Sequence, residues 1–598
     1  MYILGIACYY HDASAALIKD GALVAAAMEE RFSRKKHDND YPTQAIEFCL
    51  RQAGIKSEDL DYVVFYEKPM VKLERILLTT LNTFPRSLEV WNRAILGWLK
   101  DKLWIKSTIQ TKLNVASDKI LFCDHHMSHA ASAFFASPFR DAAVLTVDGV
   151  GEWTTTTTGK ATSFWEGDTG GANAIDLFHE QRFPHSLGLL YSTFTAYLGF
   201  RVNNGEYKVM GMSPYGEPRY VDKVNKIFSQ SADGSFHLNM DYFAFHYSAD
   251  NSYNQKFVDL FGAPRHPEAE FFTRETNPER TAEAAAMAEN QRYADVSASI
   301  QQVTEDALIK ILNNLHAQTG LDKLVMAGGV ALNTKANWRL LKETPFTEIY
   351  IQPASGDDGG SLGAALWAYH VVLGKPRNWV MPHAYWGQSF TTDECRAFLD
   401  SKGVKYEDFE GRDDEMLDVI AESLTRQKVI GLFQGRFEWG PRALGNRSIL
   451  ADPRFDHMKE VVNTKIKFRE PFRPFAPVIL REHAPEYFDY PEAAEHEAPR
   501  YMLMVAPVKA DKEDKIQAVS HKRTGRLQSI ERETNPRYYG IIERFGQITG
   551  VPVVLNTSFN LRGEPMVTTP ANALNTYMNS DIDMLAMESL LIRKPNND

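Results

Sequence analysis

The chain is poor in cysteine and has no long apolar run. Its four cysteines, Cys8, Cys49, Cys123 and Cys395, are scattered and form no C-x-x-C pair. This excludes a zinc ribbon and fits a reducing compartment. No apolar stretch is long enough to cross a bilayer, and the first residues lack the charged start and apolar core of a signal peptide. We therefore expect a cytoplasmic protein that makes no membrane contact.

Positive charge is also in deficit. The chain has 66 Lys and Arg against 77 Asp and Glu, which gives a formal charge of −11. An acidic surface argues against a nucleic-acid partner, so local basic clusters become the informative feature. With 598 residues, of which 44% are hydrophobic, the chain is long enough to form more than one domain.

Residues 124–152 (DHHMSHAASAFFASPFRDAAVLTVDGVGE) contain a helix-like segment followed by a short apolar strand. His125 and His129 are four residues apart, so on a helix they are neighbours on one face. The strand ends at Asp148, and a histidine pair beside a carboxylate is typical of a divalent-metal site. The alternative is a half-buried polar pair without a metal. His126 points elsewhere on such a helix, which indicates a supporting or structural role.

The N-terminal pattern of strand, polar turn and hairpin occurs twice. Residues 2–7 read as a strand, His11 and Asp12 form a turn, and residues 14–28 read as a hairpin. Residues 144–163 repeat this order, with a second turn expected at Gly159. Two such units predict an α/β protein with the duplicated βββαβα core of an actin-like ATPase (ASKHA) domain.

Three later segments of this first domain carry candidate ligand contacts. A strand at 324–327 leads into Gly328 and Gly329 and a helix from Asn333, and such a Gly-Gly turn lets backbone approach a nucleotide closely. Asp357 follows the strand at 348–351, at the strand end where α/β sheets bind ligands. Residues 68–113 look helical, and their Leu- and Trp-rich part around 81–103 would suit a homodimer contact.

We place the domains at 1–375 and 391–598, with a Pro- and Gly-punctuated linker at 376–390. The second domain begins as another α/β unit, with a helix at 413–426 and a strand at 429–433. Basic residues flanked by apolar and aromatic ones then recur on Pro- and Gly-rich loops, and a strand at 553–555 runs into Ser558. Such loops suit bidentate capture of a small phosphate-bearing anion. The basic residues are Arg436, Arg442, Arg447, Lys467, Arg469, Arg473 and Arg526.

Long specific motifs cover nearly the whole chain: YYHDASAAL, EERFSRKKHD, HHMSHAASAF, GEYKVMGMSPYG, GGVALN, DDGGSLGAA, GRFEWGPRALGNRSIL, RPFAP and LNTSFN. With these motifs the sequence resembles the NodU/CmcH-type O-carbamoyltransferases. The resemblance implies an actin-like domain, similar to tRNA threonylcarbamoyl-transfer enzymes, followed by a YrdC-like α/β domain. The YrdC-like domain would convert carbamoyl phosphate and ATP to carbamoyl adenylate. The actin-like domain would pass the carbamoyl group to a hydroxyl of a small natural-product acceptor.

The same resemblance implies roles for particular residues. It implies an iron(II) site, although this donor set also suits manganese or zinc, and Mg²⁺ is expected with ATP. His11, beside Asp12, is our candidate for the base or for positioning the acceptor, and the alternative is a hydrogen-bonded turn histidine. The metal ligands would be His125, His129, Asp148 and Asp357; the nucleotide contacts would include Glu206, Lys208, Gly328, Gly329 and Asn333; and the carbamoyl-phosphate pocket would be Arg442, Lys467, Arg473, Arg526 and Ser558, with Arg442 and Lys467 acting in catalysis.

Three other functions remain open at this stage. A tRNA threonylcarbamoyl-type transferase would share the first domain, but the acidic balance and the attached second domain speak against it. A hydrogenase-maturation carbamoyltransferase would carry zinc C-x-x-C motifs, which this chain lacks. A non-catalytic nucleotide-binding scaffold would have lost site residues, whereas all four presumptive ligands and the basic cluster are present.

Overall fold

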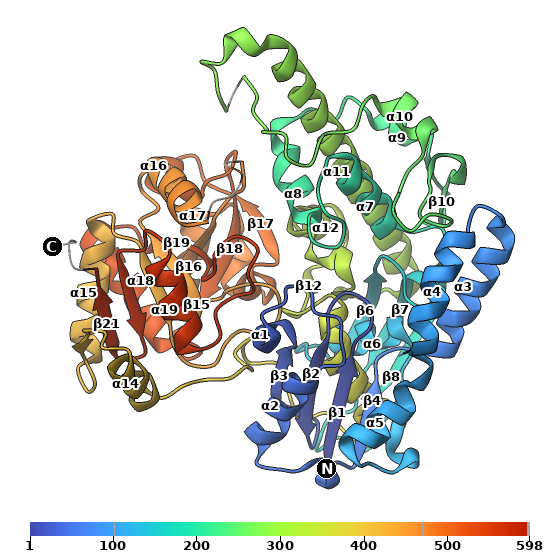
Figure 1. Cartoon of the computed structure of the whole chain (residues 1–598), viewed down its shortest axis with the longest axis horizontal. Helices are drawn as coiled ribbons and strands as arrows, with labels where there is room; N and C mark the ends of the chain where they lie inside the picture. Colours follow the sequence, from blue (N-terminus) through green and yellow to red (C-terminus); the bar gives the residue numbers. More distant parts are fainter. Residues whose placement is uncertain (101, 275, 468–469, 471, 595–598) are drawn as a thin grey trace. The chain divides into compact units, whose positions relative to one another are not determined.

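The structure is a computed structural model that describes residues 1–100, 102–274, 276–467, 470 and 472–594 (Figure 1). The chain divides into two compact units. Unit 1 contains Met1–Leu23, Asn39–Tyr41 and Gly54–Val380, and unit 2 contains Val24–Asp38, Pro42–Ala53 and Met381–Asp598. The boundary between the two units after Val380 falls within the expected linker at 376–390. Residues 24–38 and 42–53, which we placed in the first domain, group with the second unit.

Two five-stranded sheets organise the N-terminal half of the chain. The first has the order β3-β2-β1-β4-β5 and the second has the order β12-β11-β6-β7-β8. In each sheet the first strand pairs antiparallel with the second strand and parallel with the fourth. The strands are β1 (Tyr2–Ala7), β2 (Ser14–Lys19), β3 (Ala22–Met28), β4 (Tyr62–Phe65), β5 (Ile120–Phe122), β6 (Asp141–Val147), β7 (Thr154–Thr162), β8 (Ala174–Arg182), β11 (Lys323–Ala327) and β12 (Glu348–Tyr350).

This repeated topology confirms the predicted duplicated actin-like fold. One detail of the prediction is wrong, because Gly159 is not in a turn. It lies inside β7 at a bulge opposite β8, where a side chain would collide with the carbonyl oxygen of Asp176. A glycine in a strand pattern thus marks close backbone approach here rather than a reversal. The hairpin partner of β7 comes later, at 174–182.

Helices cover the sheets of unit 1, and a smaller sheet lies outside them. The predicted helix at 294–318 is longer than expected and begins at Ala284. The unassigned region 216–278 contains short elements, including β9 (Phe228–Gln230) and β10 (Phe236–Leu238). The helices are α3 (Pro69–Thr83), α4 (Leu88–Lys100), α5 (Ile105–Leu113), α6 (His125–Phe134), α7 (Leu187–Tyr197), α8 (Glu206–Met212), α9 (Val221–Val224), α10 (Gln255–Phe261), α11 (Ala284–Thr319), α12 (Thr334–Glu343) and α13 (Gly360–Trp367).

Helices α6 and α13 pack unusually closely between the two sheets. Helix α6 is rich in Ala and Ser, α13 is rich in Gly and Ala, and both are almost fully buried. A Cβ on Gly363 would lie 1.8 Å from the carbonyl oxygen of Ser128, so only glycine lets the two backbones meet. This contact fixes α6, and with it His125 and His129, relative to the strand ends.

We expect Gly363→Ala to destabilise the protein by about 1–3 kcal/mol, because the added methyl has no space in a packed core. Urea or thermal unfolding measures this loss. Gly97→Ala is the matched control, because Gly97 is also helical but has no atom within 4 Å of the added Cβ. Equal stability of the two variants would show that the α6–α13 contact is not close-packed.

Unit 2 is built on one nine-stranded sheet with the order β13-β21-β20-β14-β15-β19-β16-β18-β17. Helices α15 (Asp413–Thr425) and α18 (Pro536–Thr549) pack together and bury an apolar core against it. The strands are β13 (Glu407–Asp408), β14 (Ile430–Phe433), β15 (Arg447–Ala451), β16 (Ala476–Leu480), β17 (Met504–Pro507), β18 (Thr524–Ile530), β19 (Val553–Ser558), β20 (Met584–Met587) and β21 (Leu590–Arg593).

The other helices of unit 2 are shorter. They are α1 (Glu30–Ser33), α2 (Thr43–Ala53), α14 (Thr392–Ser401), α16 (His457–Glu460), α17 (Ala484–Tyr487) and α19 (Pro570–Met578). The α/β character of this unit agrees with the prediction, and its YrdC-like identity stays a prediction. None of the helices in the described part of the chain has the length and apolar character that a membrane span requires.

Candidate functional site

The four predicted metal ligands lie together in unit 1. Nε2 of His125 and Nε2 of His129 are 3.1 Å apart. Nε2 of His125 is 3.2 Å from Asp148 and 3.4 Å from Asp357, and Nε2 of His129 is 3.7 and 3.4 Å from the same carboxylates. All four side chains are buried, and their donor atoms lie within 4.8 Å of one another.

These distances fit a bound cation. Donors about 2.1 Å from a tetrahedral metal are about 3.4 Å from each other, which is close to the spacing found here. Both carboxylate oxygens of Asp357 are buried and have only histidine nitrogens 3.4–3.7 Å away, with no hydrogen bond. A buried carboxylate needs compensating charge, which a cation would supply. A set of two imidazoles and two carboxylates is a common ligand set for iron, manganese and zinc.

Neighbouring groups hold the donors in place. Glu152 accepts the backbone N–H of His125 at 3.0 Å, which caps the first turn of α6 in place of Asp124. The N–H of Gly329 donates to Asp148 Oδ1 at 2.9 Å. Although burial opposes its charge, contacts with the two histidines keep the pKa of Asp148 well below its usual range.

His126 has the structural role that its position on the helix indicated. Its two ring nitrogens lie 2.6 Å from Thr146 Oγ1 and 2.9 Å from the carbonyl oxygen of Thr154. Burial, and then the neighbouring histidines, lower its pKa to about 3, so the ring is neutral. His126 thus joins α6 to strands β6 and β7.

His11 lies beside the four donors and is partly exposed. Its Nδ1 lies 2.6 Å from Asp12, and its Nε2 lies 3.7 Å from Asp357 Oδ2. Burial disfavours the charged ring, but Asp357 and Asp12 outweigh this and raise the pKa of His11 to about 10. The predicted pair His11–Asp12 is therefore oriented toward the cluster, with a quarter of the His11 side chain open to solvent.

A buried ionic group next to this cluster was missed by sequence reasoning. Lys72 on α3 pairs with Glu67 at 2.5 Å, and its ammonium lies 4.7 Å from the centre of the Tyr10 ring, which in turn contacts His11. Arg75, one turn later, donates to the carbonyl oxygen of Gly151 at 3.2 Å. The available signal was the pair of basic residues three apart, and thus on one face of the helix, among several apolar residues.

The predicted nucleotide residues are divided between backbone and capping roles. Gly328 has φ +96°, and a side chain there would collide with Val147. Asn333 caps α12 by accepting the N–H of Ala336 and also bonds Gln301. Glu206 accepts a hydroxyl and two N–H groups at the start of α8, while Lys208 lies over the Phe200 ring.

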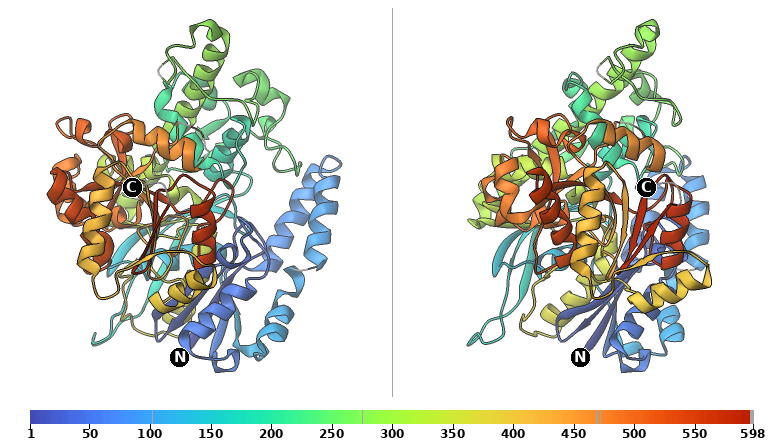
Figure 2. Two further views of the ribbon diagram at one scale, coloured as in Figure 1. Left: turned by 60° about the vertical axis from the view of Figure 1, so that its left-hand side comes forward. Right: turned by 90° about the vertical axis from the view of Figure 1, so that its left-hand side faces the viewer.

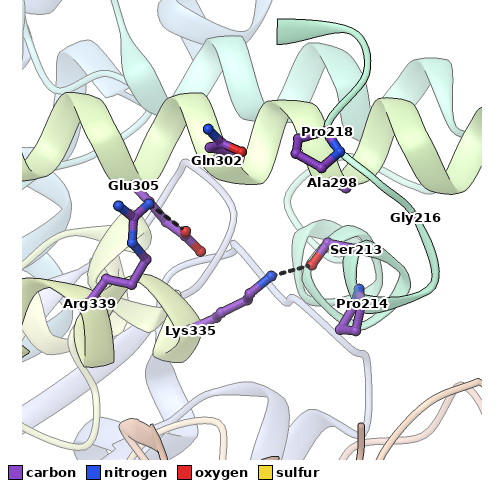
Figure 3. A pocket seen from close by; sticks show the side chains of 9 residues that line it. All are labelled: Ser213, Pro214, Gly216, Pro218, Ala298, Gln302, Glu305, Lys335 and Arg339. Carbon is purple, nitrogen blue, oxygen red and sulfur yellow. Dashed lines mark hydrogen bonds and ion pairs between the residues drawn. The ribbon is translucent and has the colours of Figure 1, made fainter.

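A pocket of about 410 Å³ lies next to Asn333, between α11, α12 and the turn after α8 (Figure 3). Lys335 extends across it to Ser213 at 3.2 Å, and Arg339 is fixed by Glu305 at 3.0 Å. Burial lowers the pKa of Lys335. None of the five predicted nucleotide residues is among the residues that line the pocket, which are Ser213, Pro214, Gly216, Pro218, Ala298, Gln302, Glu305, Lys335 and Arg339.

The residues of the predicted anion pocket of unit 2 lie at one end of the central strands of the nine-stranded sheet. Ser558 ends β19 opposite Ser448 of β15, and Arg442 is in the loop before that strand. Arg526 is at the start of β18, whose neighbour β16 begins three residues after Arg473. The register therefore places Arg442, Arg473, Arg526 and Ser558 at the same end of the strands, and Lys467 joins them through its contact with Ser558.

Lys467 and Ser558 are in direct contact. The Lys467 ammonium donates to the carbonyl oxygen of Ser558 at 2.6 Å and to Asn560 Oδ1 at 2.7 Å. Ser558 Oγ also donates to Asn560 Oδ1 at 2.8 Å. Asn560 thus contacts both Lys467 and Ser558. Sequence reasoning did not select it, although it lies in the LNTSFN motif.

Two of the conspicuous arginines have structural partners instead. Arg447 is fully buried, donates to the carbonyl oxygen of Gln434 at 2.6 Å and lies over the Phe433 ring. Arg436 donates to the carbonyl oxygens of Gly387 and Trp386. Arg473 lies 3.4 Å from Glu470, and Arg469 is outside the described residues.

Two solved structures resemble part of the chain at low similarity. Component A of (R)-2-hydroxyglutaryl-CoA dehydratase from Acidaminococcus fermentans matches 62% of this chain and 98% of its own, with TM-score 0.32 and 14% identity. HypF from T. kodakarensis matches 62% of this chain and 48% of its own, with TM-score 0.30 and 14% identity. The strand order of the two five-stranded sheets, and not these low-scoring matches, supports the actin-like fold of unit 1.

Sequence relatives extend over the whole chain. Protein sll1178 of Synechocystis sp., which is uncharacterised, is 44% identical over 99% of this chain and 97% of its own. Nodulation protein NolNO of Sinorhizobium fredii is 34% identical over 98% of this chain and 79% of its own. The family models described as carbamoyltransferase N-terminus and carbamoyltransferase C-terminus match residues 2–366 and 421–594. The chain is therefore an enzyme of the carbamoyltransferase family.

Proposed function

We propose that this carbamoyltransferase works in two steps, with ATP and carbamoyl phosphate as co-substrates and a hydroxyl of a small natural product as the acceptor. The observation that carries the proposal is the buried cluster of His125, His129, Asp148 and Asp357 beside the partly open His11. Such a cluster supplies a cation and a base in one place, which is what transfer of an acyl-type group to a hydroxyl needs.

In the first step, unit 2 forms carbamoyl adenylate. Water cleaves carbamoyl phosphate to carbamate and phosphate, and a carbamate oxygen then attacks the α-phosphorus of ATP and releases pyrophosphate. Lys467 and the arginines Arg442, Arg473 and Arg526 would neutralise the phosphate oxygens as charge moves onto them. Mg²⁺ is expected to accompany ATP in this step. The short contacts of Lys467 with Ser558 and Asn560 support such a fixed, preorganised position.

In the second step, the acceptor oxygen attacks the carbamoyl carbon, the bond from that carbon to AMP breaks, and AMP leaves. The four-donor cluster would hold a divalent ion, iron(II) being our expectation, which when bound polarises the carbamoyl oxygen or steadies the adenylate phosphate. His11, oriented by Asp12, would take the proton of the acceptor hydroxyl. When Asp357 ligates a cation, less of its charge acts on His11, whose pKa then falls toward the range of a base.

The pocket of Figure 3 is our proposed adenosine site of unit 1. It adjoins the start of α12, while the same Gly328–Asn333 loop reaches the metal cluster through Gly329. A nucleotide could thus place its base and ribose beside Lys335 and its phosphate near Asp148. In this arrangement Asn333 would support the loop through Ala336 and Gln301, and Glu206 would hold the start of α8, while direct nucleotide contacts of these two residues stay a prediction.

We expect Lys335→Met to weaken binding of AMP or a non-hydrolysable ATP analogue at least tenfold, since it removes a cation from a pocket wall. Isothermal titration calorimetry on the full chain measures the change. Lys342→Met is the matched control, because Lys342 is exposed on the same helix. Unchanged affinity in the Lys335 variant would place the nucleotide elsewhere.

The transfer step is tested with isotopically labelled carbamoyl phosphate, ATP and a panel of hydroxylated small molecules. We expect at least one acceptor to gain a carbamoyl group, detected by mass spectrometry and dependent on all three components. Label found on transfer RNA, with none on any small hydroxyl compound, would contradict the assigned acceptor class.

A further inference from the structure

The helical hairpin of α3 and α4 exposes a group of large apolar side chains to solvent in the described part of the chain. The two helices pack against each other and form a pair at the edge of unit 1 (Figure 2). Seven of the thirteen large hydrophobic side chains that are exposed in the described residues lie on this hairpin. They are Met70, Leu77, Leu78, Leu81, Phe84, Leu88 and Leu96, with exposed fractions of 40–70%.

The exposed side chains of α3 lie on one side of that helix. On α3 the spacing from Met70 to Leu77 and Leu81 follows the helical repeat, so these side chains form a stripe. Lys72 and Arg75 are buried on the other side of the helix, toward the metal cluster. The helix therefore differs from an ordinary surface helix, since both of its basic residues face inward and Leu77, Leu78 and Leu81 face solvent. An apolar stripe of this kind marks an interaction site.

The charges on the same hairpin are balanced. Among the described side chains between residues 69 and 98, the exposed charges are Glu74, Arg86, Glu89 and Arg93, two of each sign. Glu89 and Arg93 pair with each other on α4, and Arg93 also pairs with Asp250. A surface with equal numbers of both signs can face a rotated copy of itself without net repulsion. The same neutrality gives no attraction to an anionic membrane, which binds basic amphipathic helices.

We infer that this face is covered by a second copy of the chain, with the two hairpins packed about a two-fold axis as a four-helix bundle. The available area is sufficient. Seven side chains that each expose about 100 Å² offer most of the roughly 800 Å² per partner that a stable interface buries. The pairing would also brace α3, whose inner face holds Lys72 and Arg75 beside the site.

Sedimentation equilibrium of the full chain over a dilution series tests the inference. We expect the wild-type chain to be a dimer and the double variant Leu81→Lys/Leu96→Lys to be a monomer, with at least a hundredfold weaker association. The matched control is Ile548→Lys/Met578→Lys, which charges two equally exposed apolar residues of unit 2 and should leave the dimer intact. A monomeric wild type, or a hairpin variant that still dimerises, would overturn the inference.

Disulfide crosslinking gives a second readout that does not depend on a destabilising change. All four native cysteines are buried, so a cysteine introduced on the surface is the accessible thiol. We expect at least one of Leu77→Cys, Leu81→Cys and Leu96→Cys to form a covalent dimer under mild oxidation, while Ile548→Cys does not. If no hairpin cysteine crosslinks, or if the chain instead co-sediments with anionic vesicles as a monomer, the assignment to a second copy is wrong.

Discussion

Replacing Lys467 with Ala should lower pyrophosphate release from ATP and carbamoyl phosphate at least a hundredfold. The ammonium is buried at the end of β19, where it bonds the Ser558 carbonyl oxygen and Asn560 Oδ1. It is the one lysine of the predicted anion pocket. Loss of one preorganised electrostatic donor commonly costs a factor of 10²–10³. Coupled detection of pyrophosphate measures the rate directly.

Two controls separate catalysis from folding in this experiment. Lys402→Ala removes an exposed lysine of the same unit and should leave the rate unchanged. The metal content of the Lys467→Ala variant should equal that of the wild type, since the four proposed metal ligands lie in unit 1. If Lys467→Ala releases pyrophosphate at the wild-type rate, the anion pocket has been assigned to the wrong residues.

Replacing His129 with Ala should remove the bound metal and abolish carbamoyl transfer while leaving pyrophosphate release detectable. His129 is fully buried and contributes one of four donors that lie within 4.8 Å of one another. Loss of one donor from a four-donor set greatly weakens metal affinity. Elemental analysis of the purified variant measures metal independently of activity, and labelled carbamoyl phosphate follows the transfer.

The matched control for this change is Asp124→Asn. Asp124 directly precedes the histidine pair but is exposed and pairs with Lys68 instead of facing the cluster. We expect this variant to keep both metal and transfer. A His129→Ala enzyme that retains its metal, or one that loses both half-reactions together, would contradict the separation of the two steps.

The sequence predicted the framework of unit 1 well because periodic apolar strands and turn residues are local signals. The spacing of His125 and His129 and the strand end at Asp148 indicated a metal site, and the family resemblance added Asp357, which is distant in the chain but lies with the other three in the structure. The turn predicted at Gly159 was wrong because glycine is common both in turns and where two strands approach closely. Only the observed pairing with β8 distinguishes the two.

Side chains that act through tertiary contacts were harder to predict. Lys72 and Arg75 were not selected from the sequence, because their burial depends on the docking of α3 beside Tyr10 and Gly151. Glu206 and Asn333 lie in strong motifs, but their hydrogen-bonding groups are occupied by nearby backbone and by Ser192 and Gln301. The pocket at Lys335 appears only when α11 and α12 are assembled.

The most direct test of the two-step account needs no acceptor. Purified protein is mixed with ATP and carbamoyl phosphate, separately and together, and pyrophosphate is measured while carbamoyl adenylate is sought by mass spectrometry. The account predicts pyrophosphate only when both substrates are present, together with the adenylate. Formation of ADP and phosphate, or pyrophosphate release without carbamoyl phosphate, would contradict it.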